Sequence, residues 1–259
     1  MLTTGSFFWA NVAGGILNRE DFWDTIAPNV NVHIADIASL DHDVIRLEDG
    51  TEIAAQAILL GTGWLNSLTF FGDNERIRLG LPHPWRSEEK ANSERDLWKQ
   101  LEQQADEDVT RRFPMLRKPP PHHLKVAGLT PYRVYKGIGP LDDTLVAFVG
   151  YQENLNYFRG VECQAIWATA FLDQKLNLPT KEQRMVEIAR TNVYCRRRYL
   201  SSGQMGTFFP FESTIVTDRL LEEVGLTSHR KGWLKNLFSV NLAKDLRGLK
   251  DEYIAKYAT

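Results

Sequence analysis

Two short groups of small and polar residues, each placed after an apolar run, are the parts of this sequence best suited to chemistry. The first is Gly61-Thr62-Gly63, which follows the continuous apolar run 57–60 (AILL). Such a run predicts a strand that is covered on both faces, and small residues after it let a backbone approach a ligand closely. Upstream, Asp49-Gly50 predicts a hairpin turn, because glycine readily adopts the positive φ that such turns need. We therefore expect strand, turn, strand and buried strand over residues 43–64.

The second group consists of Gly150, Tyr151, Gln152 and Asn156, and it follows the apolar run 145–149 (LVAFV). The sequence predicts a buried strand at 145–150, then a loop, then a helix at 162–176. The carboxyl end of a strand and the N-terminus of the next helix form a crevice with free backbone N–H groups, which suits an electron-rich ligand. The alternative is an ordinary strand–loop–helix connection in which Gly150 only permits the turn.

Other reactive residue types give weaker signals. The adjacent His122-His123 have no evident companion ligands, so we predict no metal site. A serine-hydrolase triad is not indicated, because the sequence has no Gly-x-Ser-x-Gly motif. The arginines Arg190 and 196–198 would suit a phosphate, but a solvated helix face is the favoured interpretation of such a charge run. The sequence assigns no catalytic side chain.

The composition restricts the class of protein. The chain has 259 residues, 43% of them hydrophobic, and a net charge of −2, which predicts a globular protein with no general attraction to nucleic acid or anionic membranes. Its cysteines, Cys163 and Cys195, are too few for a disulfide framework and suit a reducing, cytoplasmic location. Residues 2–17 lack the basic start of a signal peptide, and no uncharged apolar run approaches the ~20 residues of a membrane span.

Further elements must position the two groups. Alternation predicts a strand at 30–35 (VNVHIA), and apolar periodicity with capping signals predicts helices at 20–26, 88–112, 162–176, 180–199, 217–224 and 246–257. Thr180 and Gln183 have the spacing of a capping box, and Gly225 suits a helix end. The polar stretch 88–112 is interpreted as a solvated surface helix or an insertion, and 114–121 as an extended, proline-rich connection.

The first group resembles a segment of the flavin-containing monooxygenases and their fungal N,N-dimethylaniline-monooxygenase-like relatives. In that family a pattern of the type DG…D-x-[IV]-[IV]-x-[AG]-T-G-[YW] leads from the NADPH domain back into the FAD domain. Here it stands as Asp49-Gly50 followed by 56–64 (QAILLGTGW). Gln56 departs from the acidic residue that the family often has, so the role of that carboxylate does not carry over.

The second group resembles a later segment of the same family, in which a strand ends at a glycine and a loop and helix follow. The helix often has an acidic residue, a glutamine and an aromatic or small residue in its first turn. These positions match Glu162, Gln164 and Trp167. Leu178-Pro179-Thr180 then matches the common LP[ST] continuation.

The resemblance implies an α/β fold that contains parts of two dinucleotide-binding domains, for FAD and NAD(P). Residues 1–60 would be a remnant of the NADPH-binding domain with its return hairpin. Residues 61–259 would be the C-terminal part of the FAD-binding domain with a helical extension, in which 88–121 is an insertion or surface helix plus connection. The implied cofactors are FAD and NADPH, with Gly61, Thr62, Gly63, Gly150, Tyr151, Gln152 and Asn156 nearest the flavin.

The sequence lacks the family's Gly-x-Gly-x-x-Gly turns, which hold the pyrophosphates, and its histidine-containing fingerprint. The resemblance therefore covers only the C-terminal half of a family member. The chain could be a truncated product, could need a partner chain or a second copy that supplies the missing half, or could be a retained half with a new role.

The function implied by the resemblance is that of an FAD-dependent, NADPH-using monooxygenase of fungal secondary metabolism that oxidises a small molecule. One alternative is a cofactor-free cyclase, dehydratase or isomerase, with a pocket lined by aromatic residues such as Trp64, Tyr151, Tyr157, Phe158, Phe208 and Phe209. The other is a non-catalytic half that binds a complete subunit. Apolar surface exposed where the absent half would pack is expected in that case.

Overall fold

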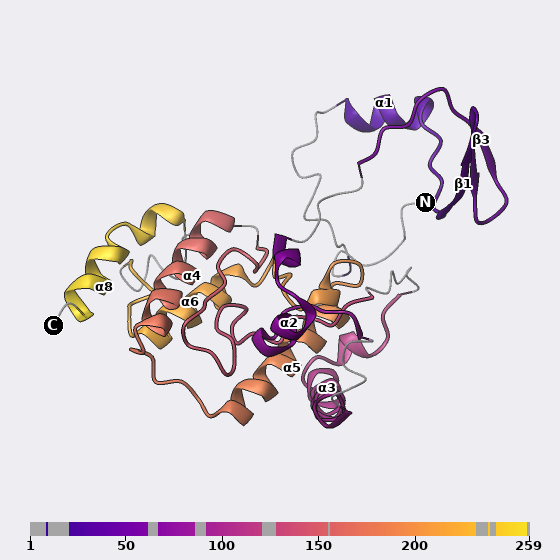
Figure 1. Cartoon of the computed structure of the whole chain (residues 1–259). Helices are drawn as coiled ribbons and strands as arrows, with labels where there is room; N and C mark the ends of the chain where they lie inside the picture. Colours follow the sequence, from indigo (N-terminus) through magenta and orange to yellow (C-terminus); the bar gives the residue numbers. More distant parts are fainter. Residues whose placement is uncertain are drawn as a thin grey trace. The chain divides into compact units, whose positions relative to one another are not determined.

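The computed structural model describes residues 9, 21–61, 67–85, 92–120, 128–154, 156–231, 238 and 242–257 (Figure 1). Close contacts divide the chain into two compact units. The smaller unit is Gly14–Thr69, and the larger unit is Phe70–Thr259 together with Met1–Ala13. No helix in the described parts of the chain is long and apolar enough to cross a membrane.

The smaller unit contains the helix α1 (Phe22–Asn29) and three strands, β1 (Ile37–Asp41), β2 (Val44–Leu47) and β3 (Glu52–Ala54). The strands form an antiparallel sheet in the order β1-β2-β3. The predicted turn at Asp49-Gly50 is confirmed: Gly50 has a φ of 85°, and the Asp49 carboxylate accepts a hydrogen bond of 2.9 Å from the Thr51 amide. This turn sets the register that places Arg46 opposite Glu52.

Two strand predictions in this unit are wrong. The predicted strand at 30–35 is not formed, and pairing begins at Ile37 instead. The run 57–60, predicted as a buried strand, is neither a strand nor buried, because Leu59 is 99% and Leu60 74% exposed. A doubly covered strand needs a layer on each face, and the described residues of this unit form one small sheet. The helix α1 also continues through Pro28, where we expected it to end.

The larger unit is helical, so the chain as described is a mixed fold with many helices and a small antiparallel sheet (Figure 1). Its helices are α2 (Asp73–Leu79), α3 (Asn92–Arg112), α4 (Tyr157–Leu172), α5 (Lys181–Arg198), α6 (Ser213–Val224) and α8 (Leu249–Tyr257). Short 3-10 turns occur at η2 (Ser67–Phe70), η4 (Pro114–Arg117), η5 (Gly203–Met205) and η6 (Ala243–Leu246).

The predicted buried strand at 145–150 is also wrong. In the described part of the larger unit, strand-like pairing is limited to isolated bridges, such as Glu153 with Phe208. Residues 145–149 run extended, and the Phe148 amide donates to the Ile138 carbonyl at 2.8 Å. The parallel sheet implied by an α/β fold is therefore not formed by the described residues.

Helix ends were predicted better than strands. The Thr180 capping box is formed in both directions, and Gly225 ends α6 at a φ of 72°. By contrast, α4 begins at Tyr157 rather than at 162, so Glu162, Gln164 and Trp167 lie beyond its first turn. Part of the connection 114–121 forms the turn η4 instead of an extended chain.

The core of the larger unit is built where α3 packs on α5 and α4 packs on α6. In α4, the indole of Trp167 stacks on the Phe171 ring, with centroids 5.3 Å apart. The helix α3 is more than a solvated surface helix, because Trp98, Ala105 and Val109 bury one of its faces. This packing fixes the loops that precede α4 and α6, and the candidate site lies between them.

Candidate functional site

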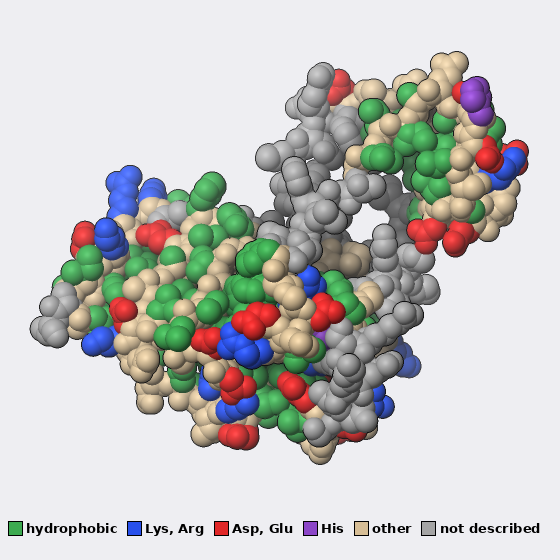
Figure 2. All heavy atoms as spheres, in the orientation of Figure 1, with side chains coloured by type: hydrophobic (Ala, Val, Ile, Leu, Met, Phe, Trp, Pro, Cys, Tyr) green, Lys and Arg blue, Asp and Glu red, His purple; other side chains and the backbone are tan. Residues whose placement is uncertain are grey.

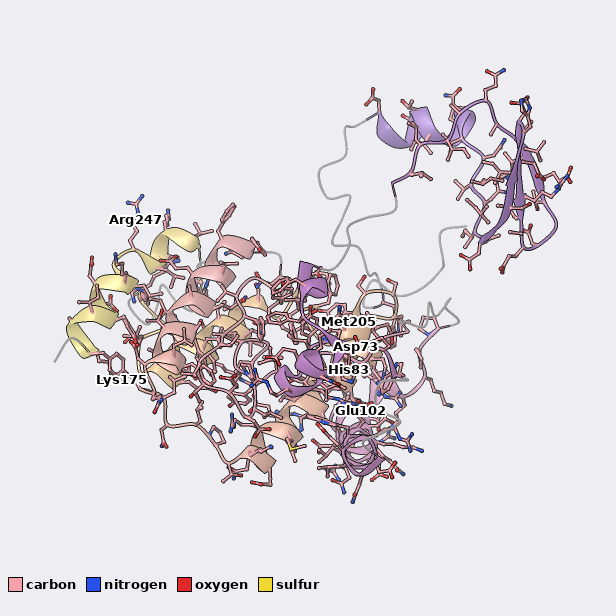
Figure 3. The ribbon with its side chains drawn as sticks, in the orientation of Figure 1. Asp73, His83, Glu102, Lys175, Met205 and Arg247 are labelled. Carbon is pink, nitrogen blue, oxygen red and sulfur yellow. The ribbon has the colours of Figure 1, made fainter. Side chains whose placement is uncertain are left out.

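A cavity of about 110 Å³ lies in the larger unit between the turn 132–139, the helices α5 and α6, and the loop before α6. Its lining includes Lys136, Gln152, Glu187, Asn192, Phe209 and Arg219. Met205, which is labelled in Figure 3, anchors the start of the 132–139 turn. Its carbonyl accepts a hydrogen bond of 3.1 Å from the Tyr132 amide.

The 132–139 turn brings backbone unusually close to a side chain. Lys136 and Gly137 both have a positive φ, 54° and 66°, and the Tyr135 amide closes the turn onto the Gly139 carbonyl at 2.8 Å. A Cβ added at Gly137 would lie 3.0 Å from Cγ of Gln152. Glycine is therefore required here both for its φ and for the close approach of Gln152.

The side chain of Gln152 is 5% exposed and has only one of its polar ends satisfied. Its Nε2 donates to the Lys136 carbonyl, which fixes the orientation of the amide. Its Oε1 is buried without a hydrogen-bond partner. An unsatisfied buried acceptor is destabilising by about 1–3 kcal/mol, so the close packing of this turn has an energetic cost.

Three charged groups beside the cavity, Lys136, Glu187 and Glu223, are paired with one another. The Lys136 ammonium lies 2.5 Å from Oε1 of Glu187 and 2.8 Å from Oε1 of Glu223. The indole N–H of Trp167 donates to the other Glu223 oxygen at 2.8 Å. Burial, and then the two carboxylates, raise the pKa of Tyr135 well above its usual value, so its hydroxyl stays protonated.

One of the predicted residues, Gln152, lines this cavity, and Gly150 and Tyr151 precede it in the same loop. Gly150 has a φ of 91°, and its amide donates to Oε1 of Gln164 at 2.9 Å. Tyr151 contacts the rings of Phe148 and Tyr132, at centroid distances of 6.3 and 5.7 Å. Gln152 lines the cavity itself. The fourth residue of that loop, Asn156, stands just before α4 and forms no side-chain cap.

The other predicted group lies in the smaller unit. Gly61 is exposed, and a Cβ added there would contact nothing within 4 Å. Thr62 and Gly63, like Trp64, lie outside the described residues. Of the aromatic residues considered for a cofactor-free pocket, Phe209 lines the cavity, whereas Phe158 is 83% exposed.

The arginine cluster of α5 has a structural role that both sequence interpretations missed. Arg190, Arg196 and Arg197 form ion pairs with Asp108, Glu102 and Asp106 of α3, and Glu102 is visible on that helix in Figure 3. The guanidinium of Arg198 lies 4.7 Å from the centroid of the Tyr199 ring. The interpretation as a solvated face holds only in part: the Arg190 side chain is 47% exposed, but these guanidinium groups also bind α3 or stack on an aromatic ring.

No protein-family model matches the chain. The chain is 30% identical to the FAD-dependent monooxygenase resA of Aspergillus sclerotiorum, over 98% of this chain and 46% of that protein. It is 29% identical to the FAD-dependent monooxygenase rstn6 of Aspergillus nomiae, over 98% of this chain and 45% of that protein. The FAD-dependent monooxygenase DEP4 of Fusarium langsethiae is 28% identical, over 86% and 40%.

The chain is a distant, partial relative of these fungal FAD-dependent monooxygenases. It spans less than half the length of the relatives it matches. The suspected resemblance is thus confirmed at this coarse level.

The residues around the predicted flavin loop fit part of such a cofactor but not all of it. Four buried polar atoms without hydrogen-bond partners belong to residues of this loop and of α4: Oε1 of Gln152, Oδ1 of Asn154, Nε of Arg159 and Nε2 of Gln164. These atoms include both donors and acceptors, as a heterocycle that carries both would need. The cavity, however, is smaller than the roughly 300–1,000 Å³ of cofactor pockets, so the described residues could border a flavin but could not enclose one.

Sequence reasoning missed the charged residues of the site. Lys136, Glu187 and Glu223 belong to no motif, and they meet only because the 132–139 turn packs against α5 and α6. The one local signal was the pair Gly137 and Gly139 around the turn, which indicated a tight backbone but not its neighbours. Within the described residues, no group of three or more His, Cys, Asp or Glu side chains gathers to hold a metal ion.

Proposed function

We propose that this chain forms the C-terminal part of an FAD-dependent, NADPH-using monooxygenase that oxidises a small molecule in fungal secondary metabolism. The observation that carries the proposal is the similarity, over 98% of the chain, to proteins named FAD-dependent monooxygenases. The unsatisfied polar atoms around the loop before α4 support it, because they provide donors and acceptors that a ligand could use.

In this proposal the loop containing Gly150, Tyr151, Gln152 and Asn156 borders the flavin, and Gly61–Gly63 form the return crossing from an NADPH domain to an FAD domain. The domain division is the one expected from the sequence, at residue 60. Bound FAD would supply the oxidation chemistry, after reduction by NADPH and reaction with oxygen. The chain's residues would orient the ring and exclude water.

Both cysteines, Cys163 and Cys195, are free and buried, which is compatible with a cytoplasmic location.

A second part of the proposal is that another polypeptide segment completes the site, in a partner chain or in a longer form of this protein. Its support is the apolar surface of the smaller unit (Figure 2). Val32, Ile34, Leu59 and Leu60 are between 74% and 99% exposed. Contiguous exposed apolar side chains mark surfaces that bind other protein segments. The relatives contain more than half of their length outside the matched region, and this region could supply the cover.

Flavin retention tests the proposal directly. The purified chain is mixed with excess FAD, alone and together with the part of the resA relative that this chain does not match. Unbound flavin is removed, and the absorption spectrum is recorded. We expect flavin bands to remain with the mixture, and NADPH oxidation to follow. Absence of retained flavin in both samples would overturn the proposal, and turnover without flavin would favour a cofactor-free enzyme.

Two glycine variants show whether the retained flavin uses the predicted loop. At Gly150 a Cβ would lie 3.1 Å from the Tyr157 hydroxyl, so Gly150→Ala should reduce flavin retention at least about tenfold, as expected for a close-approach position. Gly248→Ala is the matched control, since Gly248 also has a positive φ, 82°, but its Cβ would meet nothing within 4 Å. Equal retention by both variants would remove the loop from the flavin site.

A further inference from the structure

We propose that the cavity between α5 and α6 binds a small carboxylic acid, whose carboxylate pairs with Arg219 and whose apolar body enters the cavity. The site belongs to the larger unit alone. It goes beyond the proposed flavin function, because neither flavin nor a further polypeptide is needed to form it.

The two helices beside the cavity run in opposite directions. In the first half of α5, Glu187 meets Glu223, near the end of α6, through the Lys136 ammonium. In the second half of α5, the Tyr194 hydroxyl donates to the carboxylate of Glu212, just before α6, at 2.7 Å. The positions between these two contacts therefore face each other across the cavity.

Arg219 lies on the side of α6 that lines this cavity. Val216 and Arg219 are three residues apart, so they share one side of the helix, and both line the cavity. Thr191 lines it from α5. One turn of helix, about 6 Å along the axis, separates Arg219 and Thr191 from the carboxylates that pair with Lys136. The cavity thus has one end at Lys136, where the charges are paired, and another at Arg219 and Thr191.

Arg219 has no counter-ion among the described residues. It is exposed and forms no ion pair or hydrogen bond with them, although Glu222 and Glu223 follow it by one turn. The Thr191 hydroxyl also forms no hydrogen bond with a described residue. A guanidinium group only donates, a hydroxyl group can donate, and the planar guanidinium matches the two oxygens of a carboxylate. This end of the cavity is therefore suited to a carboxylate.

The carboxylates already present do not prevent this contact. Glu187 and Glu223 lie 2.5 and 2.8 Å from the Lys136 ammonium, which offsets their charge locally. Together with Arg219, these charges sum to zero. A ligand is therefore held by direct contact with Arg219 and not by a general positive field, and the contact is sensitive to salt because it lies at an exposed side chain.

The buried part of the lining is largely apolar. Val134, Tyr135, Ile188 and Phe209 line the cavity and are between 1% and 8% exposed. An engineered cavity of about 150 Å³ admits benzene, so about 110 Å³ admits a somewhat smaller body, such as a short branched chain. Burial of that chain adds hydrophobic stabilisation. A short, branched carboxylic acid therefore suits both parts of the site.

Two compounds of the same shape isolate the contribution of charge. 3-Methylbutanoate is ionised at pH 7, whereas 3-methylbutanamide is neutral. Binding of each to the full chain without flavin is followed by ligand-detected NMR, with dissociation constants from titration. We expect the carboxylate to bind about fivefold more tightly than the amide, as an exposed ion pair predicts. The preference should decrease in 1 M salt, where the screening length is about 3 Å.

Matched variants assign the two parts of the site. Arg219→Gln should abolish the preference for the carboxylate. Arg247→Gln should not, because Arg247, labelled in Figure 3, is also exposed but does not line the cavity. Val216→Phe fills the cavity from α6 and should abolish binding of both compounds. Ile215→Phe, at the exposed neighbouring position, should leave binding unchanged.

Equal binding of the two compounds, or a preference that persists in Arg219→Gln, would overturn the proposal and leave Arg219 to solvent or to the glutamates that follow it. No binding of either compound, or binding that survives in Val216→Phe, would also overturn it. If Val216→Phe does not fold, the comparison of the two compounds in Arg219→Gln still decides. Since no flavin is present, failure here is separate from failure of the flavin test.

Discussion

The two units of this chain bury their apolar residues to very different degrees. In the larger unit, aromatic and aliphatic side chains from α3, α4, α5 and α6 form one core, with Trp167 and Phe171 almost completely buried. Among the described residues of the smaller unit, the buried apolar side chains are Leu47 and Leu68, and most other large ones are exposed. A small sheet without a covered face is only marginally stable. The larger unit should therefore fold on its own interactions, and the smaller unit should depend on something that covers it.

The largest expected difference between the units is in how much free energy of unfolding is lost when a large side chain is removed. Trp167→Ala removes a ring that is 0% exposed, so we expect a loss of about 3–5 kcal/mol in the free energy of unfolding. Ile34→Ala, at a residue 84% exposed, should change it by less than about 0.5 kcal/mol. Urea unfolding followed by far-UV circular dichroism measures both. Similar losses would show that the smaller unit also has a core.

A second difference is expected for ion pairs. Arg159 is 3% exposed and pairs with Asp218 at 2.9 Å, and burial raises the pKa of the Asp218 carboxyl although Arg159 opposes this. Asp218→Ala would leave a buried guanidinium without its carboxylate, which should lower stability by about 3 kcal/mol.

The control for this ion pair is Glu52→Ala in the smaller unit. It breaks the exposed pair of Glu52 with Arg46, which has a similar distance of 2.8 Å. Its loss should be between about 0 and 1 kcal/mol, measured in the same urea experiment. If both substitutions cost the same, burial would not be what distinguishes these pairs.

The exposed apolar side chains of the smaller unit should promote association. Ile34→Lys with Leu59→Lys places two charges on that surface, and we expect the dissociation constant for self-association to rise at least about tenfold, since each buried aliphatic side chain contributes about 1.5–3 kcal/mol. Analytical ultracentrifugation measures it, and circular dichroism should stay unchanged. Ile188→Lys in the core of the larger unit should instead unfold that unit. Unchanged association in the double variant would mean that this surface does not mediate self-association.

The sequence predicted the helices well because their signals are local. The Thr180 capping box and the glycine at 225 act within one turn of the helix they limit, and both are formed as expected. The hairpin at Asp49-Gly50 is local in the same sense. The strands predicted at 57–60 and 145–150 failed because a strand exists only when a distant segment pairs with it. An apolar run specifies a preference for burial but not the partner that provides it.

The candidate site shows the same limit. The sequence predicted one ligand-facing loop with Gly150, Tyr151 and Gln152, and of these residues Gln152 lines a cavity. It could not predict that Lys136 meets Glu187, because these residues are 51 positions apart and are joined by the packing of a turn on α5. Nor could it predict that the arginines of α5 bind α3. Such contacts depend on tertiary packing, which no short spacing encodes.

The smallest expected difference between the units is in how the free energy of unfolding responds to pH, which should have opposite signs. In the larger unit, burial raises the pKa of Glu153. As the pH rises past the ordinary glutamate pKa, the unfolded chain releases this proton before the folded chain does. The free energy of unfolding therefore decreases, and this decrease is complete above the folded-state pKa. In the smaller unit, hydrogen bonds from Thr51 lower the pKa of Asp49. That contribution is present above the ordinary aspartate pKa and is lost as the pH falls through the folded-state pKa.

Matched amides test this opposition in sign. Relative to the unsubstituted chain, Glu153→Gln should gain stability as the pH rises above the ordinary glutamate pKa of about 4.3, as measured by the urea midpoint. Asp49→Asn should remove the acid-side titration of the Thr51 amide resonance, because that amide donates to the Asp49 carboxylate at 2.9 Å. If Glu153→Gln instead loses stability as the pH rises, the carboxylate of Glu153 must be stabilised by a partner, and the loop before α4 would then be a site where charge is bound rather than excluded.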